Sequence, residues 1–173
     1  DRMVFIADQA DSALGRTAFS PIVRENHDYV TVVLDAKGRA LSQCTWSIPV
    51  FITSLPVAAQ TYFLPKFPPH TLAEGDVLAT NDPEIGTGHL PDITVAKPVF
   101  LDGALIGFAG TVAHSPDIGG RIRSADSREV YEEGLQIPPM KLYEGGRRNE
   151  TLWRLIDLNV RKGHQMLGEL HSV

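Results

Sequence analysis

The strongest chemical signal in the chain is a pair of short motifs that hold two histidines and two aspartates. His89 and Asp92 belong to the motif GTGHLPD, and His114 and Asp117 belong to AHSPD. Two imidazoles with one or two carboxylates suit Zn, Mn or Fe better than Ca or Mg, which prefer oxygen ligands alone. Such an ion with an open coordination position activates water or polarises a carbonyl group. The two motifs are therefore candidates for a metal site.

A predicted β-hairpin brings the two motifs together. Residues 93–101 and 104–114 are rich in β-branched and apolar side chains, and the Asp-Gly dipeptide at 102–103 favours a two-residue type I′ turn between them. The motifs flank the ends of these runs that lie away from the turn. We therefore expect their side chains to gather at the open end of the hairpin.

The register of this hairpin decides which residues face each other. Direct pairing next to the turn places Asp92 opposite Ala113 and Pro91 opposite His114. Pro98 indicates an edge strand or a bulge within the pair, and a bulge would shift the register by one residue. Such a shift preserves the cluster but reverses the direction of the side chains.

Each histidine also has a simpler interpretation. His89 in a loop rich in Gly and Pro is compatible with a solvated or hydrogen-bonded polar residue. His114 is in phase with Ile106, Phe108 and Val112 on a face that we expect to be buried, which is typical of a hydrogen-bonded core histidine. The spacing alone leaves metal binding and these interpretations open.

Two acidic residues and one thiol are weaker candidates. Glu25 and Asp28 precede a predicted strand and offer a further metal ligand or an acid/base group, although a solvated strand entrance is the more common explanation. Cys44 has no neighbouring cue for activation, so we expect a buried structural thiol rather than a nucleophile.

Composition narrows the class of protein. The chain has 173 residues, and 16 Lys and Arg against 21 Asp and Glu give a net charge of -5, so it lacks the basic field that binds nucleic acid. Its apolar runs, such as 105–109, are far shorter than the ~18 residues that cross a bilayer. A single cysteine is compatible with a reducing compartment. We expect a cytoplasmic protein with neither nucleic-acid nor membrane partners.

The hydrophobic patterns and the turn residues predict an α+β fold. We expect a mixed or antiparallel sheet with hairpins and flanking helices, which forms a single metal-site-bearing domain over residues 1–173 and is part of a larger subunit. The expected elements are a helix over 2–18 that Pro21 ends, a hairpin over 29–45, a helix over 53–64, a strand over 76–80, a short helix over 126–133 and a final helix capped by Asn149 or Thr151.

Eight ordered motifs resemble the hydantoinase B/oxoprolinase family. They are, in chain order, RTAFSP, DAKGR, GDV, NDP, GHLPD, AHSPDIGG, EEGLQIPP and NVR. The family includes B subunits of N-methylhydantoinases, part of 5-oxoprolinases and related subunits of acetone and acetophenone carboxylases. Its B subunits are much longer than this chain, so the resemblance implies the N-terminal portion of a longer chain.

The resemblance also implies a set of site residues. His89, Asp92 and His114 match the family's metal ligands, and Asp28 is a fourth ligand by its place in the block that reads Glu-Arg-x-Asp-Phe-Ser in the family. This chain has ENHDYV there, without the arginine and the serine. Asp117 and Glu25 are the predicted catalytic side chains.

The implied activity is that of an ATP-dependent amidohydrolase that opens cyclic amides of the hydantoin or 5-oxoproline type, with a metal-activated water attacking the carbonyl. The metal is a divalent Zn, Mn or Fe ion, and ATP with Mg is expected on a hydantoinase A-like partner within a hetero-oligomer. One alternative is an ATP-dependent ketone carboxylase that uses the same metal site. Others are a non-catalytic subunit-interaction domain and a purely structural metal with four protein ligands.

Overall fold

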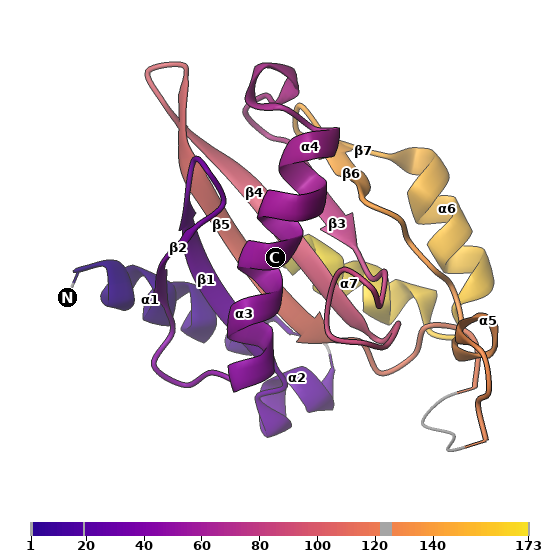
Figure 1. Cartoon of the computed structure of the whole chain (residues 1–173). Helices are drawn as coiled ribbons and strands as arrows, with labels where there is room; N and C mark the ends of the chain where they lie inside the picture. Colours follow the sequence, from indigo (N-terminus) through magenta and orange to yellow (C-terminus); the bar gives the residue numbers. More distant parts are fainter. Residues whose placement is uncertain (1, 19, 122–125, 173) are drawn as a thin grey trace.

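The structure, a computed structural model, describes residues 2–18, 20–121 and 126–172. Within these ranges seven strands form one antiparallel sheet in the order β2-β1-β5-β4-β3-β6-β7. Figure 1 shows the long β4–β5 hairpin near the centre of the sheet. The strands are β1 (Tyr29–Asp35), β2 (Ala40–Gln43), β3 (Val77–Thr80), β4 (Asp92–Leu101), β5 (Ala104–His114), β6 (Met140–Glu144) and β7 (Arg147–Arg148).

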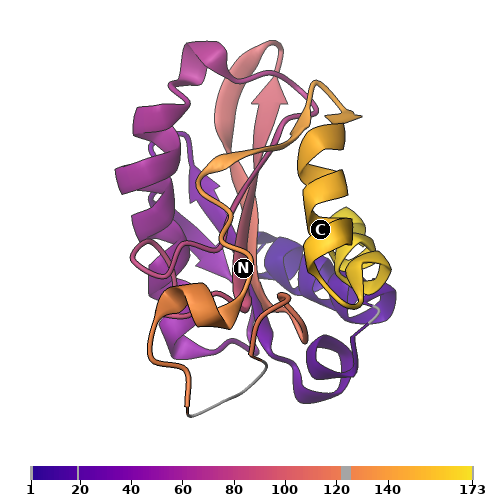
Figure 2. The same ribbon diagram turned by 90° about the vertical axis from the view of Figure 1, so that its right-hand side faces the viewer.

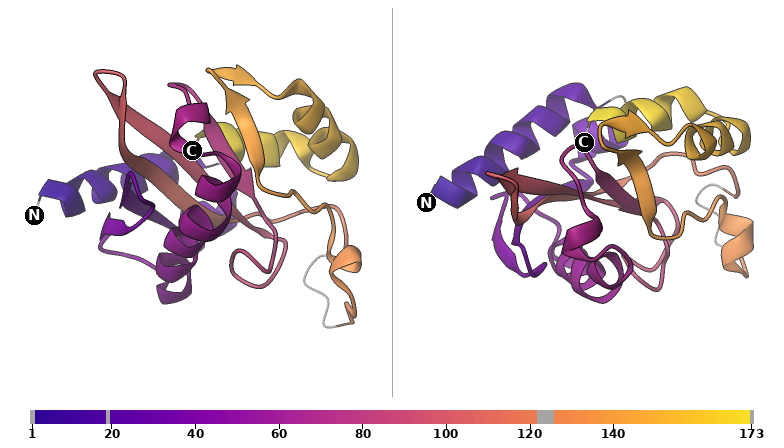
Figure 3. Two further views of the ribbon diagram at one scale, coloured as in Figure 1. Left: turned by 45° about the horizontal axis from the view of Figure 1, so that its top comes forward. Right: turned by 90° about the horizontal axis from the view of Figure 1, so that it is seen from above.

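Helices cover both faces of the sheet, so the chain has three layers (Figures 2 and 3). One face carries α3 (Pro49–Ala58), which continues through the π turn η1 (Ala59–Phe63) into α4 (Leu64–Lys66). The other face carries α1, α6 and α7. The remaining bounds are α1 (Arg2–Thr17), α2 (Pro21–Asn26), the 3-10 turn η2 (Pro69–Thr71), α5 (Val130–Glu133), α6 (Glu150–Asn159) and α7 (Gly163–Ser172). The predicted α+β class is confirmed.

Strand alternation divides the apolar core between the two layers of helices. Val32 and Phe108 point to one face and share a buried cluster with Leu55 of α3. Val95 points to the opposite face and shares a second cluster with Ile156 of α6. Burial of each such side chain stabilises the fold by about 1.5–3 kcal/mol. The central strands are therefore covered on both sides and form a rigid base for the residues at their ends.

The β4–β5 hairpin contains both the predicted turn and a bulge. Asp102 and Gly103 have φ of 50° and 79°, as a type I′ turn requires. Leu101 pairs with Ala104, but the register shifts by one residue between Val99 and Phe100. The open end of the hairpin consequently pairs Asp92 with His114 rather than with Ala113.

Several element boundaries differ from the prediction. Pro21 does not only end the first helix but also begins α2. The hydroxyl of Ser20 caps the start of α2 by accepting a hydrogen bond of 3.1 Å from Ile22 N. The helix expected over 53–64 begins at Pro49, and helix in the predicted 126–133 segment is confined to α5. The final predicted helix is α6, with Asn149 as its cap. The β6–β7 hairpin and α7 were not anticipated. None of the helices in the described ranges is both long and apolar enough to cross a membrane.

Candidate metal centre

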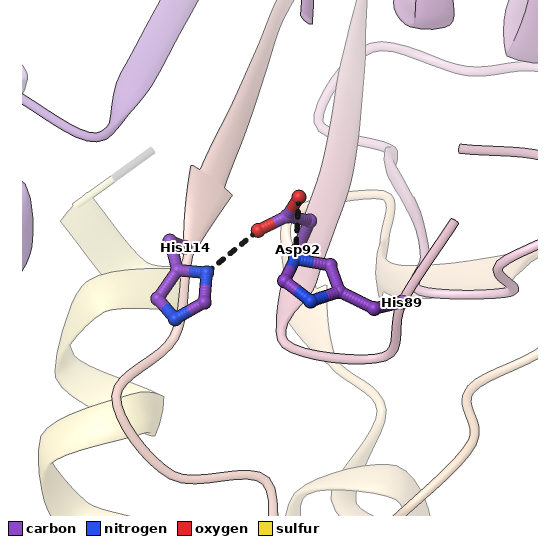
Figure 4. A group of neighbouring side chains, drawn as sticks. All are labelled: His89, Asp92 and His114. Atoms are coloured by element: carbon purple, nitrogen blue, oxygen red, sulfur yellow. Dashed lines mark hydrogen bonds and ion pairs between the residues drawn. The ribbon is translucent and has the colours of Figure 1, made fainter. Parts of the chain in front are cut away.

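The last rung of the β4–β5 hairpin places a carboxylate beside two imidazoles (Figure 4). Asp92 is the first residue of β4 and His114 the last residue of β5, and His114 Nδ1 lies 2.8 Å from Asp92 Oδ1. His89 comes from the loop that precedes β4, and its Nε2 lies 2.9 Å from Asp92 Oδ2. The two imidazole ring centroids are 5.3 Å apart. The predicted gathering at the open end of the hairpin is therefore present for His89, Asp92 and His114, whereas Asp117 is not in the group.

The site is graded in exposure, with its carboxylate deepest. The side chain of Asp92 is 4% exposed, that of His114 12% and that of His89 43%. The hydroxyl of Thr87 donates a further hydrogen bond to Asp92 Oδ2. A carboxylate at this depth is sustained as an anion by its hydrogen-bond donors.

The pKa shifts follow from these contacts. Burial alone would raise the pKa of Asp92, but hydrogen bonds from His114, His89 and Thr87 outweigh it and hold that pKa well below its ordinary value. The hydrogen bond to Asp92 raises the pKa of His89 against the opposing effect of burial, and the charges of Asp92, Glu133 and Asp28 add to the rise. The site therefore has a negative potential that favours a cation.

The donor set fits a divalent transition metal. His89, Asp92 and His114 each offer one ligand atom, and these atoms lie within 4.8 Å of one another. Nitrogen and carboxylate donors in one cluster suit Zn, Mn or Fe better than Ca or Mg. Among the residues that the structure describes, His89, Asp92 and His114 are the group of at least three His, Cys, Asp or Glu side chains whose ligand atoms lie this close together.

Asp28 adjoins the group through its backbone. Its carbonyl accepts a hydrogen bond of 3.0 Å from the N–H of His114, directly before the point where β1 begins to pair with β5. Its charge also contributes to the raised pKa of His89. Asp28 is not among the three residues whose ligand atoms are clustered. Its role as the fourth ligand stays a prediction.

The two predicted catalytic residues have other contacts. Asp117 is buried, and its carboxylate accepts hydrogen bonds from Arg161 Nη1 at 3.1 Å and from the N–H of Gly119 at 2.9 Å. Glu25, on α2, has a side chain that is 64% exposed and forms an ion pair of 3.4 Å with Arg24. Their catalytic roles stay predictions.

Sequence reasoning missed two residues that support the group. Thr87 lies inside the GTGHLPD motif, but its hydrogen bond to Asp92 depends on the fold of the loop. Glu133 lies in the distant EEGLQIPP motif, and its Oε2 accepts from Leu90 N at 2.9 Å. Cys44 is buried as expected, and its burial raises the pKa of the thiol.

Comparison with known proteins shows the family to which the chain belongs. The Hydantoinase B/oxoprolinase family matches residues 1–173, and the chain is a member of it. The chain is 35% identical over 172 residues to an uncharacterised protein of Methanocaldococcus jannaschii, covering 97% of this chain and 30% of that protein.

Relatives with named activities cover similar parts of the chain. The B subunit of a putative D-/L-hydantoinase from Pseudomonas sp. is 30% identical, covering 96% of this chain and 29% of that protein. The 5-oxoprolinase of Saccharomyces cerevisiae is 36% identical, covering 89% of this chain and 12% of that protein. The chain thus spans less than a third of the length of these relatives.

Two solved structures share the fold. The nucleotide-free structure of acetone carboxylase, from work on ATP-dependent acetone carboxylation, matches with a TM-score of 0.87 and 21% identity, covering 99% of this chain and 23% of that chain. The ATP-dependent caprolactamase of Pseudomonas jessenii matches with a TM-score of 0.81 and 30% identity, covering 99% of this chain and 30% of that chain.

Proposed function

We propose that the chain is the metal-bearing part of an ATP-dependent amidohydrolase that opens a cyclic amide. The observation that carries the proposal is the His89–Asp92–His114 group at the last rung of the hairpin. The relatives support the substrate class, because hydantoins, 5-oxoproline and caprolactam, the substrates that their names indicate, are all cyclic amides.

The residues of the candidate site have separate proposed roles, the first of which is to bind the metal ion. His89, Asp92 and His114 would hold a divalent Zn, Mn or Fe ion, with Asp28 as the proposed fourth ligand. When bound, the ion would supply Lewis acidity to polarise a carbonyl group and to lower the pKa of water. Asp92 positions the two imidazole rings, because each of its two oxygens contacts one of them.

Acid/base work falls to the remaining carboxylates. Asp117 and Glu25 are the proposed acid/base residues. Hydrogen bonds from Arg161 and from the N–H of Gly119 hold the Asp117 carboxylate in place. The Glu25 side chain is 64% exposed and is paired with Arg24 on the same helix.

ATP would be used on a partner. We propose a hetero-oligomer in which ATP and Mg are held by a hydantoinase A-like partner, since the hydantoinase relative is named as one subunit of its enzyme. Phosphorylation of the amide oxygen there would prepare the substrate for ring opening. The single cysteine supports a reducing compartment such as the cytoplasm.

A ketone carboxylase is the second candidate, favoured by the TM-score of 0.87 to acetone carboxylase. That likeness concerns the fold, and the same metal site would serve an activated ketone. A non-catalytic subunit-interaction domain and a structural metal are the remaining alternatives. A structural metal would have all its positions filled by protein ligands, whereas a catalytic ion would keep at least one position open for water or substrate.

One set of assays separates these candidates. The chain, together with its ATP-binding partner, is incubated with ATP and either hydantoin, 5-oxoproline or caprolactam, or with acetone or acetophenone and bicarbonate. Ring-opened product formed together with ADP supports the amidohydrolase, and carboxylated ketone supports the alternative. The Asp92→Asn variant should lose product in either case. Product formation that Asp92→Asn does not change would refute a catalytic metal centre.

A further inference from the structure

The backbone of Leu90 anchors the loop that carries His89. Leu90 lies between His89 and Asp92 and is fully buried. Its N–H donates to Glu133 Oε2 at 2.9 Å, and its carbonyl accepts from Asn81 Nδ2, also at 2.9 Å. Because both polar groups of Leu90 are bonded, the backbone that follows His89 has a fixed position.

Asn81 joins this backbone to the segment that carries Glu133. Its Nδ2 also donates to the carbonyl of Leu135 at 2.9 Å, and its Oδ1 accepts from the N–H of Ile137 at 2.6 Å. Asn81 is 2% exposed, so a bond lost here leaves a polar group without water as a substitute. The loop and the segment over 133–137 therefore form one bonded unit.

A close backbone crossing delivers Glu133 to that unit. Gly119 and Gly134 form a β-bridge, and Leu135 N donates to the carbonyl of Ile118 at 2.8 Å. Gly134 has φ of 140°, and a Cβ at this residue would collide with the carbonyl oxygen of Ile118. Glycine is required here because any side chain would force the two strands of backbone apart.

We infer that Glu133 is a positioning residue for the metal centre. Glu133 holds His89 in place by accepting the hydrogen bond from the N–H of Leu90. The inference rests on the proposed function, because it needs His89 to be a metal ligand. Glu133 lies outside the clustered ligand group and reaches the loop from 43 residues away. Loss of the Glu133 carboxylate should therefore make the position of His89 less fixed, while all the metal ligands remain present.

Three variants test this role by Co²⁺ binding to the metal-free protein. Glu133→Ala removes the acceptor for Leu90, whereas Glu133→Gln keeps an amide oxygen in its place. Glu132→Ala is the matched control, because Glu132 is the neighbouring glutamate in the sequence. Its Oε2 accepts a hydrogen bond of 3.1 Å from Arg128 N instead of from Leu90. Affinity is measured against a competing chelator, and the visible absorption of bound Co²⁺ reports the ligand geometry.

We expect Glu133→Ala to weaken Co²⁺ binding about tenfold and to alter the Co²⁺ spectrum. Glu133→Gln should recover the affinity to within about threefold, because a neutral hydrogen bond replaces a charge-assisted one. Glu132→Ala should match the wild type. Wild-type affinity and spectrum in Glu133→Ala would overturn the inference alone. Failure of the wild-type chain to bind Co²⁺ would overturn the proposed function itself.

Discussion

Asp92 and His114 face each other across the last rung of the β4–β5 hairpin, with Asp92 Oδ1 2.8 Å from His114 Nδ1. The pairing couples the candidate site to the sheet, because each residue is the end of a long central strand. His89 then completes the group from the adjacent loop by contacting the other carboxylate oxygen.

Removal of either strand-end residue should abolish metal binding. We expect His114→Ala and Asp92→Asn to lower the bound metal from about one ion per chain to near zero, since each variant removes a ligand. Metal content after purification without chelators checks this. His164→Ala is the matched control, because the His164 side chain is 96% exposed and its nearest acidic partner is Asp157. Wild-type metal content in His114→Ala would contradict the ligand assignment.

Metal identity should follow the chemistry of the donors. After removal of metal by a chelator, we expect Zn²⁺, Mn²⁺ or Fe²⁺ to bind with higher affinity than Mg²⁺ or Ca²⁺, because two of the three donors are imidazoles. Free metal at 100 times its dissociation constant should raise the free energy of unfolding by about 2.7 kcal/mol. Thermal unfolding with each ion measures this. Equal stabilisation by Mg²⁺ would argue against the mixed donor set.

A buried ion pair away from the site should control acid stability. Asp76 is fully buried, and its carboxylate accepts from Lys141 Nζ at 2.8 Å and from the N–H of Gly145 at 2.8 Å. Burial alone would raise the pKa of Asp76, but these bonds and one from Ala73 lower it below its ordinary value. The resulting stability is present above the unfolded pKa of about 3.9 and is lost as pH falls through the folded pKa.

Asp76→Asn should therefore destabilise the chain by about 3 kcal/mol at pH 7, because Lys141 loses its buried counter-ion. Below pH 4 the variant should lose stability less steeply than the wild type. Urea unfolding at several pH values measures both effects. Glu74→Gln, at an exposed carboxylate two residues away, is the control. A variant curve parallel to that of the wild type in acid would show that Asp76 does not contribute to this pH dependence.

Two glycines with positive φ should respond differently to alanine. Gly103 has φ of 79° and no atom within 4 Å of an added Cβ, so Gly103→Ala should cost about 1 kcal/mol from backbone strain alone. Gly134→Ala should cost about 3 kcal/mol, because its Cβ would also clash with the oxygen of Ile118. Chemical denaturation compares the two. Equal losses would indicate that the backbone crossing yields without cost.

Local signals predicted the hairpin well, and the remaining uncertainty lay in its register. The Asp-Gly turn and the clustering at the open end could be predicted because both depend on neighbouring residues. Pro98 indicated a possible bulge, and the structure has the shift between Val99 and Phe100. The choice of Ala113 or His114 opposite Asp92 depends on that single shift, which no local pattern fixes.

Contacts between distant segments lay beyond sequence reasoning. Nothing in the EEGLQIPP motif indicates that Glu133 accepts from Leu90, because the bond exists only once the 118–121 and 132–135 segments cross. The start of α2 was different in kind, since Ser20 followed by Pro21 is a recognisable helix start that the prediction did not use.

The gradient of exposure across the candidate centre gives it a direction. Asp92 closes the inner end and His89 lies at the solvent side, so a molecule that reaches a bound ion would arrive past His89. The loop that Asn81 and Glu133 fix therefore carries the most exposed member of the group. Substitutions in that loop should change how fast a metal ion enters and leaves, whereas substitutions at Asp92 should change whether an ion is retained.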